Sequence, residues 1–276
     1  MRVTVMRRLL FVIAGIFFSV TSLAQGMVQE GQDGYGILFR QSVKSCDEFM
    51  CRFNEEEYFP DLDVNDEKYG KKNFILLFDY RIAQEKGKEA FIDEVGQFYQ
   101  AIKDNNVQLK FESKKWYAEL RTTFVFKKKD VEIGLVFQPE KTPKDLWCWT
   151  IVGVNGLEKV GYADSTNRMV ISPEQNEAEF IEVESDFKFA SKHFSQFRSY
   201  QLELDALSYF FALVESGSLT FKNRIETIYY FFDVPSYVFS VKYHARSISN
   251  TGWLISSYQK VTAKEKATKQ KKLLSK

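Results

Sequence analysis

The sequence is poor in the residues that most often carry chemistry. It has only two histidines, His193 and His244, which lie 51 positions apart in a chain of 276 residues. Neither has a cysteine or carboxylate at the spacing that zinc sites use, so no metal site is predicted. No catalytic motif is present either. The sequence therefore predicts no cofactor and does not identify an activity.

Cysteine is also scarce, since three residues allow at most one internal disulfide. Cys46 and Cys51 lie in a predicted helix, where a spacing of five points their side chains in different directions. Cys148 could pair with either one, and three unpaired cysteines are the alternative. Because 45% of the residues are hydrophobic and 26 are Phe, we expect a packed core rather than a disulfide framework to hold the fold.

The N-terminal apolar stretch is too short to cross a membrane. Three arginines precede residues 9–20, and the small-residue sequence Ser22-Leu23-Ala24 follows before Gln25. A membrane-spanning helix needs about 20 apolar residues, whereas this order is typical of a cleaved signal peptide. No cysteine near the cleavage point could carry a lipid. We predict a signal peptide over 1–24, cleavage between Ala24 and Gln25, and a secreted or periplasmic protein without a membrane anchor.

The charge is distributed unevenly along the chain. Residues 25–259 contain 28 basic and 36 acidic residues, while residues 260–276 contain seven lysines and one acidic residue. The tail has no aromatic residue on which a base could stack, and the acidic body would repel a polyanion. We interpret 261–276 as a flexible basic tail and predict no nucleic-acid binding. Contact of the tail with an anionic surface or with nucleic acid is the alternative.

Helical periodicity dominates the first part of the mature chain. Residues 25–36 contain four glycines and are interpreted as a flexible leader before a first α+β unit over 37–160. A helix is predicted over 42–55 with Ser42 or Ser45 as its cap, and a polar surface loop over 60–73. A second helix is predicted over 86–103. Its apolar face consists of Phe91, Val95, Phe98, Tyr99 and Ile102.

After Asn106 the apolar residues recur every second position, which predicts an antiparallel meander. We expect a short strand over 107–111 and longer strands over 116–126, 131–137 and 146–154, with a polar turn at 127–130. Residues 146–154 are apolar on both faces, which is typical of a central strand.

The second half repeats this order at an offset of roughly 105 to 110 residues, which predicts two tandem units. A polar linker over 161–179 precedes the second unit, 180–260. In that unit we expect a helix over 204–214 that ends at Gly217, a short strand over 218–221, and strands over 225–232, 236–246 and 252–259.

This order of elements resembles the nuclear transport factor 2-like superfamily. The resemblance rests on the helix 89–102 leading into 107–111, the strands over 116–154, and residues 204–259, especially 234–239 and 250–255. It implies an α+β fold in which helices pack into the concave face of a strongly curved antiparallel sheet. Members range from enzymes that abstract protons or dehydrate small molecules to binding and assembly modules. The resemblance therefore carries over no catalytic residue.

His244 is one candidate for chemistry. It shares a strand face with Lys242 and Arg246, whose charges disfavour the cationic imidazole, so it could act as a neutral base. The alternative is a solvated sheet face. Two acids are further candidates, Glu119 in the strand 116–126 and Asp205 at the helix 204–214.

Three residues are candidates for binding. Arg121 and Tyr117 lie on the same side of their strand as Glu119 and form either a binding group inside the cone or an ordinary cross-strand contact. Tyr229 begins an aromatic run that lines a ligand pocket or belongs to the core.

Two functions remain open from the sequence. The preferred one is a non-catalytic secreted module that binds a small ligand or an envelope protein through the concave face or an exposed sheet surface. The alternative is a small-molecule lyase or isomerase in which Glu119 or Asp205 works with His244 or a tyrosine. A monomer is favoured over a homodimer, because a tandem chain can cover its open sheet face internally.

Overall fold

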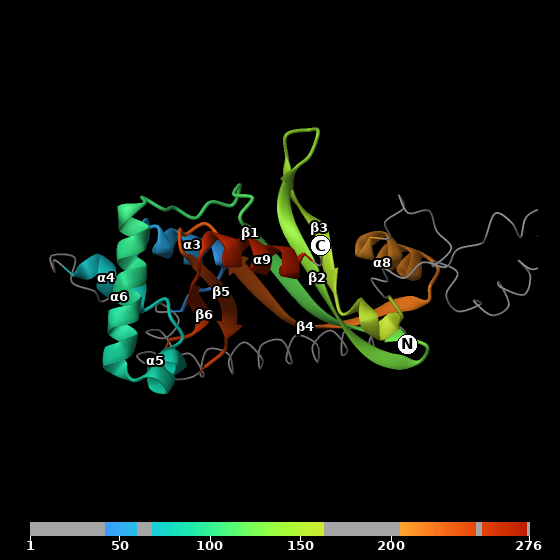
Figure 1. Ribbon diagram of the computed structural model, residues 1–276, viewed down its shortest axis with the longest axis horizontal. Helices are drawn as coiled ribbons and strands as arrows, with labels where there is room; N and C mark the ends of the chain where they lie inside the picture. The colour runs from blue at the N-terminus through green and yellow to red at the C-terminus, as the bar shows by residue number, and fades with distance from the viewer. Residues whose placement is uncertain (1–41, 60–67, 163–204, 247–249, 275–276) are drawn as a thin grey trace, which may run out of the picture. The chain divides into compact units, whose positions relative to one another are not determined.

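The computed structural model describes residues 42–59, 68–162, 205–246 and 250–274 (Figure 1). The predicted signal peptide with Ala24 and Gln25, the leader and residues 163–179 of the linker lie outside them. The described part is an α+β fold, as predicted. The chain divides into two compact units, Met1–Phe111 with Asp233–Lys260 and Glu112–Phe232 with Val261–Lys276. Each unit draws on both halves of the chain, which differs from the two successive units predicted over 37–160 and 180–260.

The described part of the first unit contains four helices and two strands. These are α3 (Cys46–Phe53), α4 (Tyr69–Ile75), α5 (Tyr80–Lys86), α6 (Lys88–Asp104), β5 (Tyr237–His244) and β6 (Gly252–Lys260). The predicted helices 42–55 and 86–103 are confirmed by α3 and α6. Ser45 is the cap of α3, since its side chain accepts a hydrogen bond from the Glu48 backbone at 3.1 Å. Four members of the predicted α6 face are buried: Phe91, Val95, Phe98 and Ile102.

Aromatic rings join the helices of the first unit to β5 and β6. Phe98 of α6 stacks on Tyr237 with ring centroids 4.5 Å apart. Phe53 of α3 stacks on Phe239 at 5.6 Å. Phe74 of α4 meets the ring of Phe98 edge-on at 5.4 Å. α3, α4 and α6 are therefore each held by contacts to residues far away in the sequence.

Two local predictions in this unit were wrong. Residues 69–73 were assigned to the end of the polar loop 60–73, but they belong to α4, because burial of Phe74 among the other rings stabilises a helix that local propensity does not favour. Residues 107–111 are not a strand. The side chain of Asn54 takes the place of a strand neighbour, accepting from the Leu109 backbone N–H at 2.8 Å and donating to the Leu109 carbonyl at 2.9 Å.

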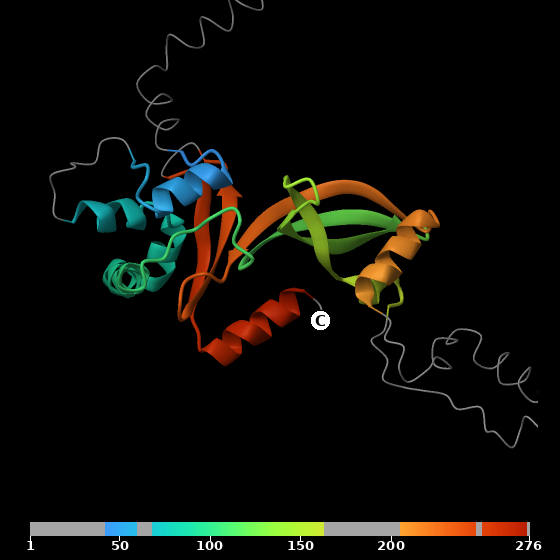
Figure 2. The same cartoon turned by 90° about the horizontal axis from the view of Figure 1, so that it is seen from above.

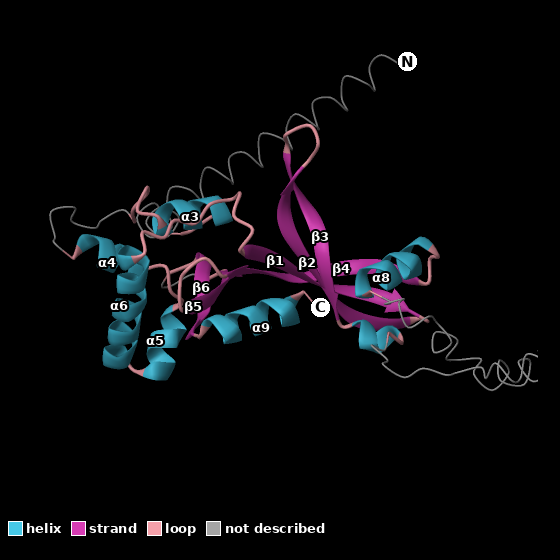
Figure 3. Cartoon of the chain, turned by 45° about the horizontal axis from the view of Figure 1, so that its top comes forward, coloured by secondary structure: helices cyan, strands magenta, loops and turns pink. Residues whose placement is uncertain are grey.

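The second unit contains a four-stranded antiparallel arrangement in the order β3-β2-β1-β4 (Figure 3). Its elements are β1 (Trp116–Phe126), β2 (Lys129–Lys141), β3 (Trp147–Asn155), the 3-10 helix η1 (Leu157–Val160), α8 (Ala206–Glu215), β4 (Leu219–Phe231) and α9 (Ala263–Leu273). The predicted strand 116–126 has the bounds of β1. β1 and β2 are joined by a two-residue turn in which Lys127 and Lys128 have φ of 48° and 63°.

The pairing of β1 with β4 joins the two halves of the chain. Eleven register pairs run from Trp116↔Phe231 to Phe126↔Leu219. The two halves therefore share strand partners instead of forming one sheet each. The predicted short strand 218–221 and strand 225–232 are one continuous strand, β4, because β1 offers a partner along the whole length.

The prediction of a central position for residues 146–154 was wrong. β3 is the outermost strand of the β3-β2-β1-β4 arrangement and pairs only with β2 among the described residues. β2 pairs with β1 only as far as Phe137, whereas its pairing with β3 continues to Lys141↔Trp147. The last part of the β2–β3 hairpin is thus two-stranded. It tolerates Pro139 because the missing N–H has no ladder bond to make on the open side.

α8 covers one face of this sheet and α9 contacts the other. Phe210 of α8 meets Phe124 of β1 with ring centroids 5.7 Å apart, in a core with Ile133, Leu135 and Leu219. α9, drawn in red in Figure 2, meets the opposite side of β1. The contact is made by the Gln270 side chain, which donates to the Tyr117 hydroxyl at 2.6 Å. None of the helices in the described part has the length and hydropathy needed to span a bilayer.

The prediction of a flexible tail over 261–276 was wrong for residues 263–273, which form α9. Thr262 and Glu265 make a capping box, in which the Thr262 side chain accepts from the Glu265 backbone at 3.2 Å and Glu265 accepts from the Thr262 N–H at 2.7 Å. Contacts to β1 and β3 then hold a lysine-rich helix that would be marginal in isolation.

Gly252 at the start of β6 allows a close backbone crossing. Residue 43 lies beside it as a parallel bridge, with the Val43 N–H donating to Thr251 O at 3.1 Å and the Trp253 N–H donating to Val43 O at 2.8 Å. Gly252 has a φ of 95°, and a Cβ at this position would lie 2.0 Å from Val43 O. Only glycine fits this crossing.

Replacing Gly252 should therefore cost much more stability than replacing a glycine that is constrained by φ alone. We expect Gly252→Ala to lower the free energy of unfolding by about 3 kcal/mol or more, because strain and a backbone clash act together. The matched control is Gly217→Ala, with a φ of 70° and nothing within 4 Å of the new Cβ, which should cost about 1 kcal/mol. Urea unfolding followed by circular dichroism measures both. Equal losses of stability in the two variants would contradict the clash expected between a Cβ at position 252 and the Val43 backbone.

Candidate functional site

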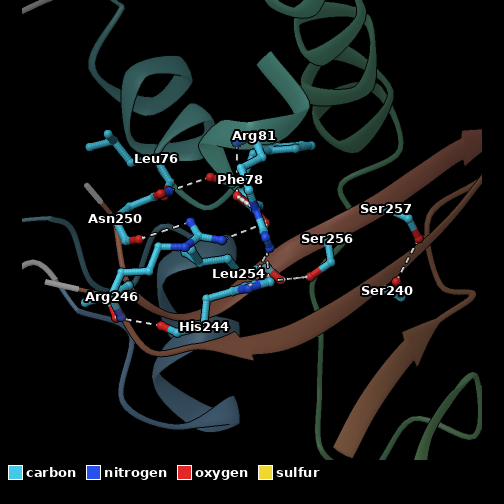
Figure 4. Close-up of polar contacts among 12 residues, drawn as sticks. Leu76, Phe78, Arg81, Ser240, His244, Arg246, Asn250, Leu254, Ser256 and Ser257 are labelled. Atoms are coloured by element: carbon cyan, nitrogen blue, oxygen red, sulfur yellow. Dashed lines mark hydrogen bonds and ion pairs between the residues drawn. The ribbon is translucent and has the colours of Figure 1, made fainter. Parts of the chain in front are cut away.

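A polar cluster in the first unit surrounds Asp79, which caps α5. Figure 4 shows three members of the cluster, Arg81, His244 and Arg246. The carboxylate is 5% exposed. It accepts hydrogen bonds from the Arg81 backbone at 3.0 Å, from the Arg81 guanidinium at 2.8 and 3.0 Å, and from Arg246 Nη2 at 2.9 Å. Two guanidinium groups therefore compensate one buried carboxylate.

The surroundings of Asp79 keep it ionised. Burial alone would raise its pKa, but the hydrogen bonds from Arg81 and Arg246 and the positive charge that His244 can carry outweigh burial and hold the pKa well below its usual range. Asp79 is consequently an acceptor at neutral pH and not a proton donor.

The hydrogen bonds of His244 define its tautomer. Arg81 Nη2 lies 3.1 Å from Nδ1, and because a guanidinium can only donate, Nδ1 accepts. Nε2 then carries the proton and donates to Ser256 Oγ at 2.9 Å, while Ser256 Oγ donates to Leu254 O at 3.1 Å. The chain of donors and acceptors is complete only with a neutral imidazole.

The electrostatic environment of His244 favours the same neutral form. Burial lowers its pKa, and Arg246, Arg81 and Lys242 lower it further against the attraction of Asp79. The sequence correctly indicated that basic neighbours disfavour the cation. The alternative of a solvated sheet face was wrong, because the imidazole is only 12% exposed and packs against residues from α5.

Asp79, His244 and Ser256 are the residue types of a serine hydrolase triad, but their geometry is different. In a triad the acid holds one ring nitrogen and the serine contacts the other. Here Asp79 Oδ2 lies 3.5 Å from Nε2, the nitrogen that already contacts Ser256, and Arg81 occupies Nδ1. The ring has no vacant acceptor that could take the serine proton. The cluster does not provide a nucleophile activated by His244.

The remaining bonds of the cluster connect segments of the fold. Thr251 Oγ1 donates to His244 O at 2.6 Å. Asn250 Nδ2 donates to Leu76 O at 3.1 Å and also to Phe78 O. The cluster thus ties the chain before α5 to the end of β5 and the start of β6, which is a structural role.

The candidates Glu119, Arg121 and Tyr117 make ordinary contacts within the second unit. Arg121 Nη1 lies 2.7 Å from Oε1 of Glu226, its partner in the β1–β4 register, so the cross-strand alternative is confirmed for it. Glu119 accepts from the Tyr230 hydroxyl at 3.0 Å. Tyr117 accepts from Gln270 of α9.

The two acid candidates are not linked to each other by a hydrogen bond in the described part of the chain. Asp205 is the cap of α8 and accepts from the Ser208 backbone at 2.8 Å. Hydrogen bonding to the Ser208 side chain, followed by that to the Ser208 backbone, lowers the pKa of Asp205. Glu119 and Asp205 belong to the second unit, and His244 belongs to the first.

An exposed apolar surface, which the sequence reading missed, lies along the first part of β3. We define the β3 aromatic surface as Trp147 and Trp149 of β3, Leu146 directly before β3, and Tyr229 of β4. The first three are 37%, 39% and 64% exposed. The buried ring of Trp116 supports it, with centroids 4.9 Å from Trp149 and 5.9 Å from Tyr229. The sequence signal for this surface was that residues 146–154 are apolar on both faces, but the pattern was interpreted as that of a central strand. The candidate Tyr229 belongs to this surface.

Neither the possible metal ligands nor the cysteines of the described residues identify a functional site. No group of three or more His, Cys, Asp or Glu side chains in the described residues could hold a metal ion. Cys46, Cys51 and Cys148 are free thiols, which is the unpaired alternative. Burial, followed by the charge of Asp47, raises the pKa of Cys46 far above its ordinary value, so this thiol is not a ready nucleophile.

Comparisons of the chain with protein-family models, with characterised proteins and with solved structures found no match.

His244 should make stability depend on pH in the mildly acidic range. Its pKa is lower in the folded protein than its ordinary value of 6.5, so the unfolded chain takes up the proton first. Stability from the neutral ring is complete above about pH 6.5 and is lost as the pH falls below it. The variant His244→Gln does not titrate and should show a flatter pH dependence of the free energy of unfolding.

Urea unfolding between about pH 7.5 and 5 measures this difference. The variant His193→Gln serves as the background for both proteins, because it removes the only other histidine. If the two proteins lost stability in parallel on acidification, His244 would not be held neutral by its surroundings.

Proposed function

We propose that this protein is a non-catalytic binding module, secreted or periplasmic, that takes an extended segment of a partner protein at the outer edge of β3. The observation that carries the proposal is a mismatch between sequence and position. β3 is apolar on both faces, as central strands are, yet it is the outermost strand of its arrangement in the described residues.

The backbone of an outermost strand supplies the first part of such a site. Every second residue of β3 directs its N–H and C=O groups away from β2. Natural proteins usually protect these groups with lysine, proline or a bulge, and the stretch from Trp147 to Ile151 has none of these. An extended peptide can pair with these groups by strand addition.

The side chains of β3 supply specificity. Trp147 and Trp149 lie opposite Lys141 and Pro139 in the register and so point to one face. Two residues along a strand span about 7 Å, and an added strand presents its own side chains at the same interval. Exposed tryptophans supported by a buried ring are typical of the residues that dominate binding energies.

The β2–β3 hairpin would also gain stability from a third strand. Beyond Phe137 it consists of β2 and β3 alone, and isolated two-stranded ribbons are marginal in water. A partner strand would complete a three-stranded edge and cover the tryptophans. The enzyme alternative with Glu119, Asp205 and His244 gains no support, because each of these groups is engaged by a structural contact.

Patterns in the sequence lead us to propose export and a family relationship as well. The order of arginines, apolar run and small residues at 1–24 supports a secreted or periplasmic location. The similarity of element order supports a relationship to the nuclear transport factor 2-like superfamily, and the α+β composition with antiparallel strands is compatible with it.

Export can be tested at the N-terminus. Expressed with its full sequence in a bacterium, the protein should be recovered outside the cytoplasm with Gln25 as its first residue, as mass spectrometry would establish. Ile16→Asp interrupts the apolar run and should leave the full-length chain in the cytoplasm. Gln29→Asp, in the leader, should be exported and cleaved normally. An intact N-terminus on exported protein would argue against cleavage.

Strand addition can be tested by selecting binders. A phage library of random peptides of about ten residues, long enough to pair along the strand, should yield sequences with alternating apolar residues on the mature chain 25–276. Trp147→Lys places a charge on the edge and should weaken their binding at least about tenfold. Tyr243→Lys changes an aromatic residue of the first unit that is 56% exposed, and it should have no effect.

Two results would overturn this function. One is the absence of any enriched peptide that depends on Trp147. The other is a wild-type chain that forms dimers in light scattering and becomes monomeric in Trp147→Lys, which would assign the edge to a second copy.

A further inference from the structure

We propose that the lysine face of α9 docks this protein on an anionic phospholipid surface. The face, defined as Lys264, Lys269, Lys271 and Lys272, consists of exposed residues on an 11-residue helix. The fifth lysine, Lys266, points to the opposite side and donates to Phe232 O at 3.1 Å.

The helix holds these charges in place. The capping box at Thr262 defines its start, Gln270 donates to Tyr117, and the Asn155 side chain donates to Leu273 O at 3.1 Å near its end. The contacts with Tyr117 and Asn155 lie on the side that faces the sheet. The lysines opposite them are therefore gathered on one surface, whereas a flexible tail would spread the same charges through solvent.

The charges of this face are only partly offset within the described residues, by the carboxylate of Glu265. None of its four lysines forms an ion pair with a described carboxylate. The only acidic residue of α9, Glu265, accepts from the backbone and the hydroxyl of Thr262. These hydrogen bonds and the charge of Lys269 lower the pKa of Glu265, which therefore stays ionised. The face thus presents four positive charges beside one negative charge on the same helix.

The chemistry of the face favours lipid headgroups over nucleic acid. α9 has no aromatic residue for stacking on bases and no arginine for bidentate contacts to a base edge or phosphate. Lysine ammonium groups act as hydrated point charges. Each contributes a factor of roughly five in attraction to an anionic bilayer surface, so four acting together suffice for reversible binding.

Binding of this kind is peripheral and sensitive to salt. α9 has no apolar face left to insert, since its half-buried positions contact the sheet. Electrostatic attraction to headgroups is screened within about 10 Å at 0.1 M salt. The inference stands independently of strand addition, because it concerns another element of the second unit.

The experiment uses the mature chain 25–276 and sedimented vesicles of phosphatidylglycerol with phosphatidylcholine. We expect binding at about 50 mM salt, release at about 500 mM, and none to vesicles of phosphatidylcholine alone. The variant Lys264→Gln, Lys269→Gln, Lys271→Gln, Lys272→Gln should bind several hundredfold more weakly. Glutamine has nearly the helix propensity of lysine, and circular dichroism checks that α9 remains.

The matched control removes the same charge elsewhere through Lys88→Gln, Lys110→Gln, Lys114→Gln and Lys144→Gln, which are also exposed positions. This control variant should keep at least about a fifth of the wild-type affinity for the anionic vesicles. The lysines that it removes lie outside the α9 face and act on the vesicle only through long-range attraction. Equal losses in both variants, or no binding of the wild-type chain, would overturn the proposal. So would tighter binding to single-stranded DNA than to the vesicles in the same salt.

Discussion

The first unit depends on the compensation of one buried carboxylate. Asp79 caps α5, donates its backbone N–H to Ile255 O of β6 at 2.9 Å, and accepts from Arg81 and Arg246. A buried charge without such partners would cost several kcal/mol. The two guanidinium groups are therefore part of the fold, and they bring the ends of β5 and β6 against α5.

The same constraint explains why a chemically suggestive set of residues is not a catalytic site. Arg81 neutralises Asp79 and at the same time occupies Nδ1 of His244. The imidazole is left neutral, with its other nitrogen directed at Ser256. Groups that would have to exchange protons during a reaction are instead saturated with hydrogen bonds. A binding role, in which surfaces rather than reactive groups matter, is consistent with this arrangement.

Both proposed binding surfaces lie in the second unit, and they differ in their physics. The β3 aromatic surface offers directional backbone hydrogen bonds and apolar rings, which select a strand-forming partner. The lysine face of α9 offers charge without directional bonding, which suits a diffuse anionic surface. In each case the local sequence and the position in the fold disagree. The sequence of β3 is typical of a central strand, yet β3 lies at an edge. The sequence of residues 263–273 is typical of a flexible tail, yet these residues form a helix that contacts the sheet.

The sequence by itself determined the elements whose periodicity is local. β1 has the predicted bounds, and the buried face of α6 and the glycine that ends α8 were also predicted from spacing. Only the tertiary structure decided the outer position of β3, the replacement of a strand by Asn54 at Leu109, the docking of α9 and the burial of His244. The physical reason is that periodicity reports which side of an element is apolar, whereas strand order and polar burial depend on hydrogen-bond partners that lie far away in the chain.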